Sequence, residues 1–104
     1  MEGKVSSVAN QSLVGCSLDD AVHLFSLRPP TCMKIDIDGG EIAVLRGAGE
    51  LINGSELCDI LIETDEQAAT AAAVRSCLES AGFKLVAEHR RGEGGAHNLI
   101  WSRR

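Results

Sequence analysis

The stretch Met33-Lys34-Ile35-Asp36-Ile37-Asp38-Gly39-Gly40-Glu41 decides the fold of this 104-residue chain. From Cys32 to Ile37 the chain is short and apolar, with prolines before it and glycines after it, which predicts a buried β-strand. From Glu41 to about Leu51 the apolar positions repeat with the period of a helix, and Asn53-Gly54 supplies a stop. The centre of the chain is therefore expected to be a strand, an acidic glycine turn and a helix.

The same alternation continues on both sides of this centre. Ser17 begins a helix that ends before Pro29-Pro30, because the residue before a proline is pushed out of helical geometry. Towards the C-terminus we expect a strand over 58–63, a helix closed by Gly82, and strands over 83–87 and 99–101 that are joined by a glycine-rich hairpin. This order predicts an α/β fold, whose ligands bind beyond the carboxyl ends of its parallel strands.

Acidic residues gather where the two predicted parallel strands end. Asp36, Asp38 and Glu41 follow the first strand, and Glu63 ends the second. Carboxylates at a strand end can act as a base, bind the hydroxyl or amino groups of a ligand, or hold a hard cation, although three carboxylates alone do not define a metal site. The structural alternative is that Asp38 caps the following helix and Glu41 favours its dipole. Spacing alone leaves both interpretations open.

Composition excludes several classes of function. The net charge is -5 and aromatic residues make up 3% of the chain, so the sequence lacks the basic stripe and stacking platform of a nucleic-acid-binding protein. It has no apolar run long enough to span a membrane and no secretory leader pattern, and we expect a cytoplasmic protein with no membrane partner. The cysteines at 16, 32, 58 and 77 lack zinc-site spacing and are expected to be unbridged core side chains, so no metal is predicted.

The central motif resembles that of the FkbM-type methyltransferases. The resemblance rests on Leu18-Asp19-Asp20, on Met33 to Ala48 and on Ile60-Leu61-Ile62-Glu63, and it runs from about residue 13 to residue 101. The consensus motif of the family is close to K-I-D-V-E-G-x-E followed by V-L-x-G-A. Asp38 here replaces the first glutamate of this motif with a side chain that is one carbon shorter. These enzymes depend on S-adenosylmethionine, and many are O-methyltransferases that act on natural products or sugars.

The resemblance implies a fold, a cofactor and a site. The fold would be a partial Rossmann-like, three-layer sandwich with a mixed sheet, in which the strands lie in the order Lys34, Ile60, Leu99, Phe83 and the last strand of the chain is antiparallel to its neighbours. Asp36 and Asp38 would be catalytic, and Gly39, Glu41 and Glu63 would bind the cofactor or the substrate. The cofactor would be S-adenosylmethionine, and the partner would be a small-molecule methyl acceptor.

The N-terminal residues differ from those of a complete enzyme of this kind. Residues 1–16 offer no glycine-rich cofactor loop of the type that such folds carry after their first strand. We expect residues 1–12 to be flexible or irregular and residues 13–104 to form the C-terminal half of a methyltransferase domain. The strand edge that a missing neighbour leaves open is expected to self-associate or to pair with an N-terminal half.

Other functions compete with methyl transfer. One alternative is a non-catalytic partner or remnant half-domain. Asp36-Ile37-Asp38-Gly39 also resembles the D-x-D-G opening of haloacid-dehalogenase-type phosphatases, in which the first Asp is the nucleophile, but Gly40 stands where that family has Thr or Val. An EF-hand is excluded because the twelfth position of that loop, a Glu, is Gly47 here.

Overall fold

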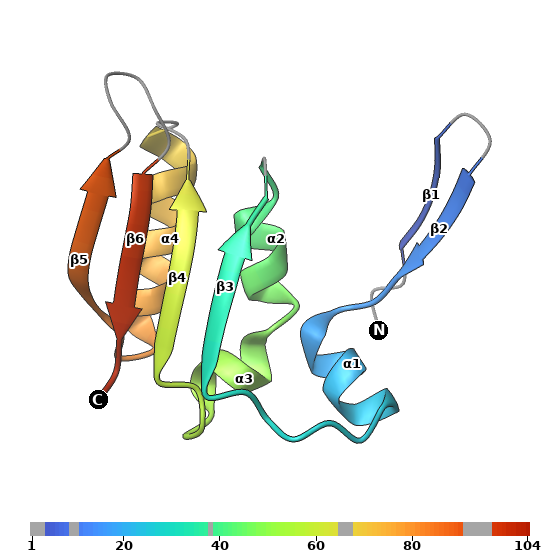
Figure 1. The fold of residues 1–104 in the computed structure, drawn as a ribbon, viewed down its shortest axis with the longest axis horizontal. Coiled ribbons are helices and arrows are strands. Elements are labelled where there is room, and N and C mark those ends of the chain that lie inside the picture. The colour runs from blue at the N-terminus through green and yellow to red at the C-terminus, as the bar shows by residue number, and fades with distance from the viewer. Residues whose placement is uncertain (1–3, 9–10, 38, 65–67, 91–96) are drawn as a thin grey trace.

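The computed structural model describes residues 4–8, 11–37, 39–64, 68–90 and 97–104 (Figure 1). In chain order, its elements are β1 (Lys4–Val8), β2 (Gln11–Gly15), α1 (Leu18–Leu24), β3 (Cys32–Asp36), α2 (Glu41–Arg46), α3 (Gly49–Asn53), β4 (Asp59–Thr64), α4 (Ala68–Ser80), β5 (Lys84–Arg90) and β6 (His97–Ser102). β1 and β2 form a small sheet of their own, and the other strands form a four-stranded sheet.

The strands of the larger sheet lie in the order β3-β4-β6-β5. β3 and β4 are parallel, and β6 is antiparallel to both β4 and β5. This is the strand order that the resemblance implies, with the last strand inserted between its neighbours. The predicted mixed α/β fold is therefore confirmed.

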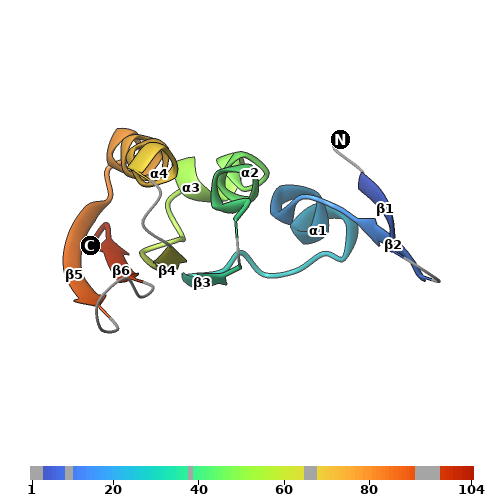
Figure 2. The ribbon, with the colours of Figure 1, turned by 90° about the horizontal axis from the view of Figure 1, so that it is seen from above.

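α2, α3 and α4 lie on one face of the larger sheet, and α1 lies beyond its β3 edge (Figure 2). The expected three-layer sandwich is thus present as two layers, because crossovers that proceed in one direction across a sheet place their helices on the same face. The opposite face, which we call the helix-free face, carries the exposed side chains of β3. None of the helices in the described ranges is long and apolar enough to cross a lipid bilayer.

The hydrophobic core fills the space between the sheet and α2, α3 and α4. Its members are apolar side chains that are at most 5% exposed, namely Ile35, Leu45, Ala48, Ile52, Leu57, Ile60, Ile62, Val74, Leu78, Phe83 and Trp101. The predicted inward positions of the last helix, Val74 and Leu78, are both in this core. Gly82 ends that helix with φ of 92°, as expected, since this left-handed conformation is costly for other residues.

Two sequence expectations, one for the N-terminal segment and one for the cysteines, differ from the structure. Residues 1–12 were expected to be irregular, but β1 and β2 pair in antiparallel register from Lys4 beside Gly15 to Val8 beside Gln11. A hairpin pairs the backbone N–H and C=O groups whatever the polarity of the side chains, so a polar run is no evidence against it. The cysteines are unbridged, as expected, but they were also expected to lie in the core, whereas Cys16 and Cys32 are exposed and Cys58 is half-buried. Cys77 is half-buried and packs against the core.

The helix expected over residues 41–51 is broken into α2 and α3 at Gly47 and Ala48. Gly47 lies against the start of α1, where a Cβ on this residue would come within 3.0 Å of the Ser17 Cβ. Its carbonyl oxygen also accepts a hydrogen bond of 2.9 Å from the Asp19 N–H. The close approach of α1 therefore explains both the break and the glycine.

Polar contacts hold α1 in place. The Asp19 carboxylate accepts hydrogen bonds from the N–H groups of Glu50 (2.8 Å) and Leu51 (3.2 Å), at the start of α3. His23 Nε2 lies 2.7 Å from Glu50 Oε2. The predicted cap of α1 is confirmed, since Ser17 Oγ accepts from the Asp20 N–H at 3.1 Å. Because α1 contains no buried residue, these contacts position it.

Arg103 joins three segments of the chain just after β6. Its guanidinium lies over the Phe83 ring, 4.3 Å from the centroid. It donates hydrogen bonds to four backbone carbonyl oxygens, those of Ile52, Ala81 (3.0 Å), Gly54 (2.6 Å) and Leu57 (2.8 Å). The C-terminal ends of α3 and α4 and the approach to β4 thus share one cation, at helix ends where carbonyl groups lack helical partners.

We expect Arg103→Gln to lower the free energy of unfolding by about 2–4 kcal/mol, because several charge-assisted hydrogen bonds are lost together. Arg103→Lys should recover less than half of this, since an ammonium group cannot reproduce the planar fork of a guanidinium. Urea denaturation followed by Trp101 fluorescence measures both. The neighbouring Arg104→Gln, which removes only an exposed pair with Asp59, is the control, and equal effects of Arg103→Gln and Arg104→Gln would contradict this role of Arg103.

The His23–Glu50 contact makes the stability of the chain depend on pH. Its hydrogen bond to the Glu50 carboxylate, and then the charge of that carboxylate, raise the pKa of His23 above its usual 6.5. A raised pKa in the folded state means that the pair stabilises the fold below pH 6.5 and that this contribution is lost as pH rises through the raised value. We therefore expect wild type to lose stability relative to His23→Gln as pH rises above 6.5. Parallel pH profiles of the two proteins would contradict this expectation.

Candidate functional site

Asp36 and Glu63 lie side by side at the carboxyl ends of the two parallel strands. Asp36 is the last residue of β3, and Glu63 in β4 is its register partner. Paired residues of neighbouring strands point to the same face, and the strands are about 4.8 Å apart. Asp36 is exposed and Glu63 is half-buried, whereas the preceding Ile35 and Ile62 are buried beneath the helices. The two carboxylates therefore share the helix-free face.

The register extends this pair into a row of four polar residues across the sheet. Asn98 in β6 is the partner of Glu63, and His89 in β5 is the partner of Asn98. We call Asp36, Glu63, Asn98 and His89 the polar row. From the sequence, His97-Asn98 could be a rim contact or part of a solvated hairpin, and His89 had no role. Their place in the row follows from alternation along β5 and β6 only once the register is known.

His97 lies on the other side of β6. Its Nδ1 is 3.0 Å from Glu88 Oε1, and this contact is the main reason why the pKa of Glu88 is lowered from its usual value. The pair is separated from the polar row by the sheet itself. The positively charged Lys34 lies on the same helix-free face as the polar row, because it is two residues before Asp36 on β3.

The turn after β3 contains two consecutive glycines in left-handed conformation. The φ angles are 84° at Gly39 and 78° at Gly40, and side chains other than glycine's are strained there. A Cβ built on Gly39 would meet no atom within 4 Å, so the backbone at this position faces open space. Gly39 is therefore accessible to a ligand that reaches the end of β3.

The remaining predicted site residues are placed less favourably or not described. Glu41 is the first residue of α2 and is only 3% exposed, which makes it much less accessible than Asp36. Asp38 lies outside the described residues, and so does its predicted capping role. The N-cap position of α2 is taken by Gly40, without a side-chain hydrogen bond. The structure thus brings Asp36 and Glu63 together, with Gly39 beyond the strand end.

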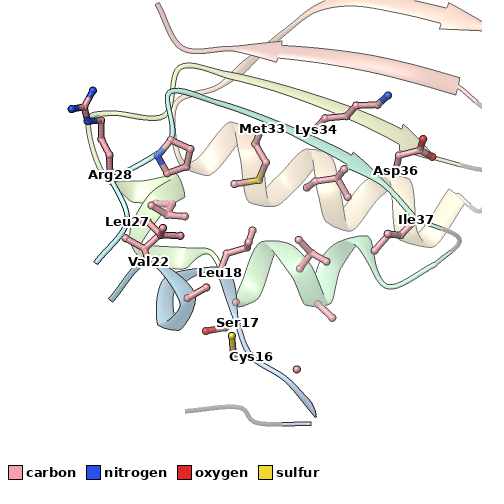
Figure 3. Close-up of a pocket in the computed structure, with 18 residues that line it drawn as sticks. Cys16, Ser17, Leu18, Val22, Leu27, Arg28, Met33, Lys34, Asp36 and Ile37 are labelled. Atoms are coloured by element: carbon pink, nitrogen blue, oxygen red, sulfur yellow. The ribbon is translucent and has the colours of Figure 1, made fainter. Parts of the chain in front are cut away.

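A large groove lies on the opposite side of β3, between this strand, α1 and α2 (Figure 3). Its volume is about 1020 Å³. Met33 points into the groove, whereas the side chains of Lys34 and Asp36 point away from it, towards the helix-free face. The lining is mostly apolar and includes Leu18, Val22, Leu27, Met33, Ile37 and Val44. The groove and the polar row therefore lie on opposite sides of β3, and Asp36 belongs to both, since it also lines the groove.

The chemistry of the polar row is that of a hydrogen-bonding and proton-accepting surface. Its carboxylates can accept protons or hydrogen bonds, and the Asn98 amide and the His89 imidazole can both donate and accept hydrogen bonds. Within the described residues no group of three or more His, Cys, Asp or Glu side chains is arranged to hold a metal ion. The row can thus orient and deprotonate a hydroxyl group.

Comparison with protein families places the chain in a known family. The model of the methyltransferase FkbM domain matches residues 14–85, which include α1, β3, β4 and the start of β5. No curated protein and no solved structure matches the chain. The matched segment covers more than half of the sequence and contains Asp36, Gly39, Glu41 and Glu63. This chain belongs to the FkbM methyltransferase domain family.

Proposed function

We propose that this chain takes part in S-adenosylmethionine-dependent transfer of a methyl group to a hydroxyl oxygen of a small molecule or sugar. One observation carries the proposal: the exposed Asp36 carboxylate stands beside Glu63 at the carboxyl ends of two parallel strands, within a segment that matches a methyltransferase family. In open α/β sheets this is the edge at which ligands bind.

The residues at this edge are chemically suited to the proposed cofactor. S-adenosylmethionine supplies a methyl group on a positively charged sulfonium, together with amino and ribose hydroxyl groups. Glu63 and Gly39 can bind such polar groups, through a carboxylate and through an accessible backbone turn. Glu41 and Asp38 remain predicted contacts, the first as a buried carboxylate at the start of α2.

Asp36 is the proposed catalytic residue. As the acceptor oxygen bonded to the methyl carbon, the bond from that carbon to sulfur would break and release S-adenosylhomocysteine. The Asp36 carboxylate would hold the acceptor hydroxyl beforehand and take its proton. Asp38 is proposed to assist from the following turn. Asp36 is suited to this role because it is exposed, while the Ile35 side chain next to it is buried in the core.

The second candidate is a non-catalytic partner or a remnant half-domain. It is favoured by the sequence of residues 1–16, which lacks a glycine-rich cofactor loop. Under this alternative, the chain would resemble a methyltransferase by ancestry and contribute only a surface to another protein. The cytoplasm remains the proposed location under either function.

Calorimetric titration with S-adenosylmethionine separates these candidates. We expect saturable binding of both S-adenosylmethionine and S-adenosylhomocysteine, with dissociation constants of about 1–100 μM. Asp36→Asn should leave cofactor affinity within about threefold of wild type but reduce methyl transfer to hydroxyl acceptors at least about 100-fold, the size of a general-base effect. Absence of cofactor binding to a folded sample would favour the non-catalytic candidate.

Asp59→Asn is the matched control for Asp36→Asn. Asp59 lies on the same face of the sheet but at the amino end of β4, where it pairs with Arg104. Its substitution should leave both binding and turnover unchanged. If Asp36→Asn turned over at the wild-type rate, Asp36 would have no part in the reaction.

A further inference from the structure

β3 ends the larger sheet. Within the described ranges it pairs on one side only, with β4. Its other edge presents main-chain N–H and C=O groups, and no proline interrupts its five residues. Such an edge readily accepts another strand, because each added hydrogen bond pairs a group that only water otherwise satisfies.

The apolar groove lies beside this edge and beneath α1 (Figure 3). Three large apolar side chains on its walls are exposed: Leu18 by 37%, Leu27 by 52% and Ile37 by 42%. They come from α1, from the segment that leads to β3, and from the residue after β3. Exposed apolar side chains gathered around a free strand edge indicate a surface that another chain covers.

The β1–β2 hairpin is a strand pair without a sheet to join. Each of its strands pairs only with the other, over five residues, which is also the length of β3. A two-stranded hairpin on its own is marginally stable in water. The ten residues of β1 and β2 include one charged residue, Lys4, and four aliphatic residues, Val5, Val8, Leu13 and Val14.

We propose that two copies of this chain form a dimer by exchanging hairpins, each hairpin adding to the β3 edge of the other copy and covering its apolar groove. The exchange is reciprocal and follows a two-fold axis, as in most protein dimers. The exchange gives β3 a neighbouring strand and at the same time adds the hairpin to a larger sheet. The proposal stands independently of the proposed methyl transfer.

The arrangement of α1 explains why the hairpin must come from a second copy. Gly15 and Cys16, at the base of the hairpin, line the groove. From there, however, β1 and β2 lead away from β3 on the far side of α1 (Figures 1 and 2). The hairpin therefore cannot reach the β3 edge of its own chain unless α1 leaves its contacts with α3.

The helix layer also disfavours direct pairing of two β3 strands. In Figure 2, α1 lies beyond β3, at the level of the other helices. A second β3 beside the first would bring its own α1 and α2 onto the same face, into the space that α1 and α2 already occupy. After the hairpin, α1 begins only at Leu18, beyond the end of β2 at Gly15, so an added hairpin brings less helix to the edge than a second β3 would.

Analytical ultracentrifugation of the full chain tests the proposal. At about 100 μM, wild type should sediment as a dimer, since weak specific dimers dissociate in the micromolar range. Ser7→Pro together with Ser12→Pro, which removes hydrogen-bond donors from a paired position of the hairpin, should raise the dissociation constant at least about tenfold. A monomeric wild type, or a dimer that persists in the double variant, would overturn the proposal.

A matched pair of substitutions tests the groove. Leu27→Arg places a charge on the groove wall and should raise the dimer dissociation constant at least about tenfold, whereas Leu24→Arg should change it less than about twofold. Leu24 is 61% exposed and does not line the groove. Fluorescence of the buried Trp101 verifies that each variant is folded. Equal weakening by both substitutions would place the interface elsewhere and refute hairpin exchange.

A peptide of residues 4–15 provides the direct competitor. Added in excess to wild type, it should occupy the β3 edge and convert the dimer into a monomer with bound peptide. The same peptide should have at least about tenfold lower affinity for the Leu27→Arg variant. A dimer that persists at saturating peptide would show that the hairpin does not bind this edge.

Discussion

The parallel pairing of β3 with β4 is the constraint on which the candidate site depends. It sets Asp36 beside Glu63, and because alternate residues of a strand face opposite sides, it also sends Ile35 and Ile62 into the core. A shift of one residue would bury the carboxylates and expose the isoleucines. The same burial that stabilises the sheet thus presents the acidic pair on the helix-free face.

The pairing is supported from both ends of the chain. Arg103 links the ends of α3 and α4 to the approach to β4, so the C-terminus closes the core beneath the helices. Asp19 caps α3 from a separate helix and thereby holds α1 beyond the edge of the sheet. α1 in turn forms the outer wall of the groove. One strand, β3, therefore has a polar site on one face and an apolar groove on the other.

Sequence patterns predicted the strand order, the acidic strand ends and the cap at Ser17, because each depends on local periodicity or on the resemblance to a family. They missed features that depend on tertiary contacts. The break at Gly47 arises from the approach of α1. Asp19 lies in the first turn of α1, but its carboxylate accepts hydrogen bonds from the start of α3. Asn98 and His89 join the polar row only through the register of β5 and β6.

The central claim is that the carboxyl ends of β3 and β4 receive the cofactor. Amide-resolved NMR titration of the chain with S-adenosylhomocysteine tests it most directly, because it locates binding residue by residue. Binding at this edge should produce the largest shifts at Asp36, Ile37, Gly39 and Glu63, while the amide signals of Asp59 and Lys84, at the other end of the sheet, do not move. Shifts centred on Asp59 and Lys84, or none at saturating ligand, would contradict it.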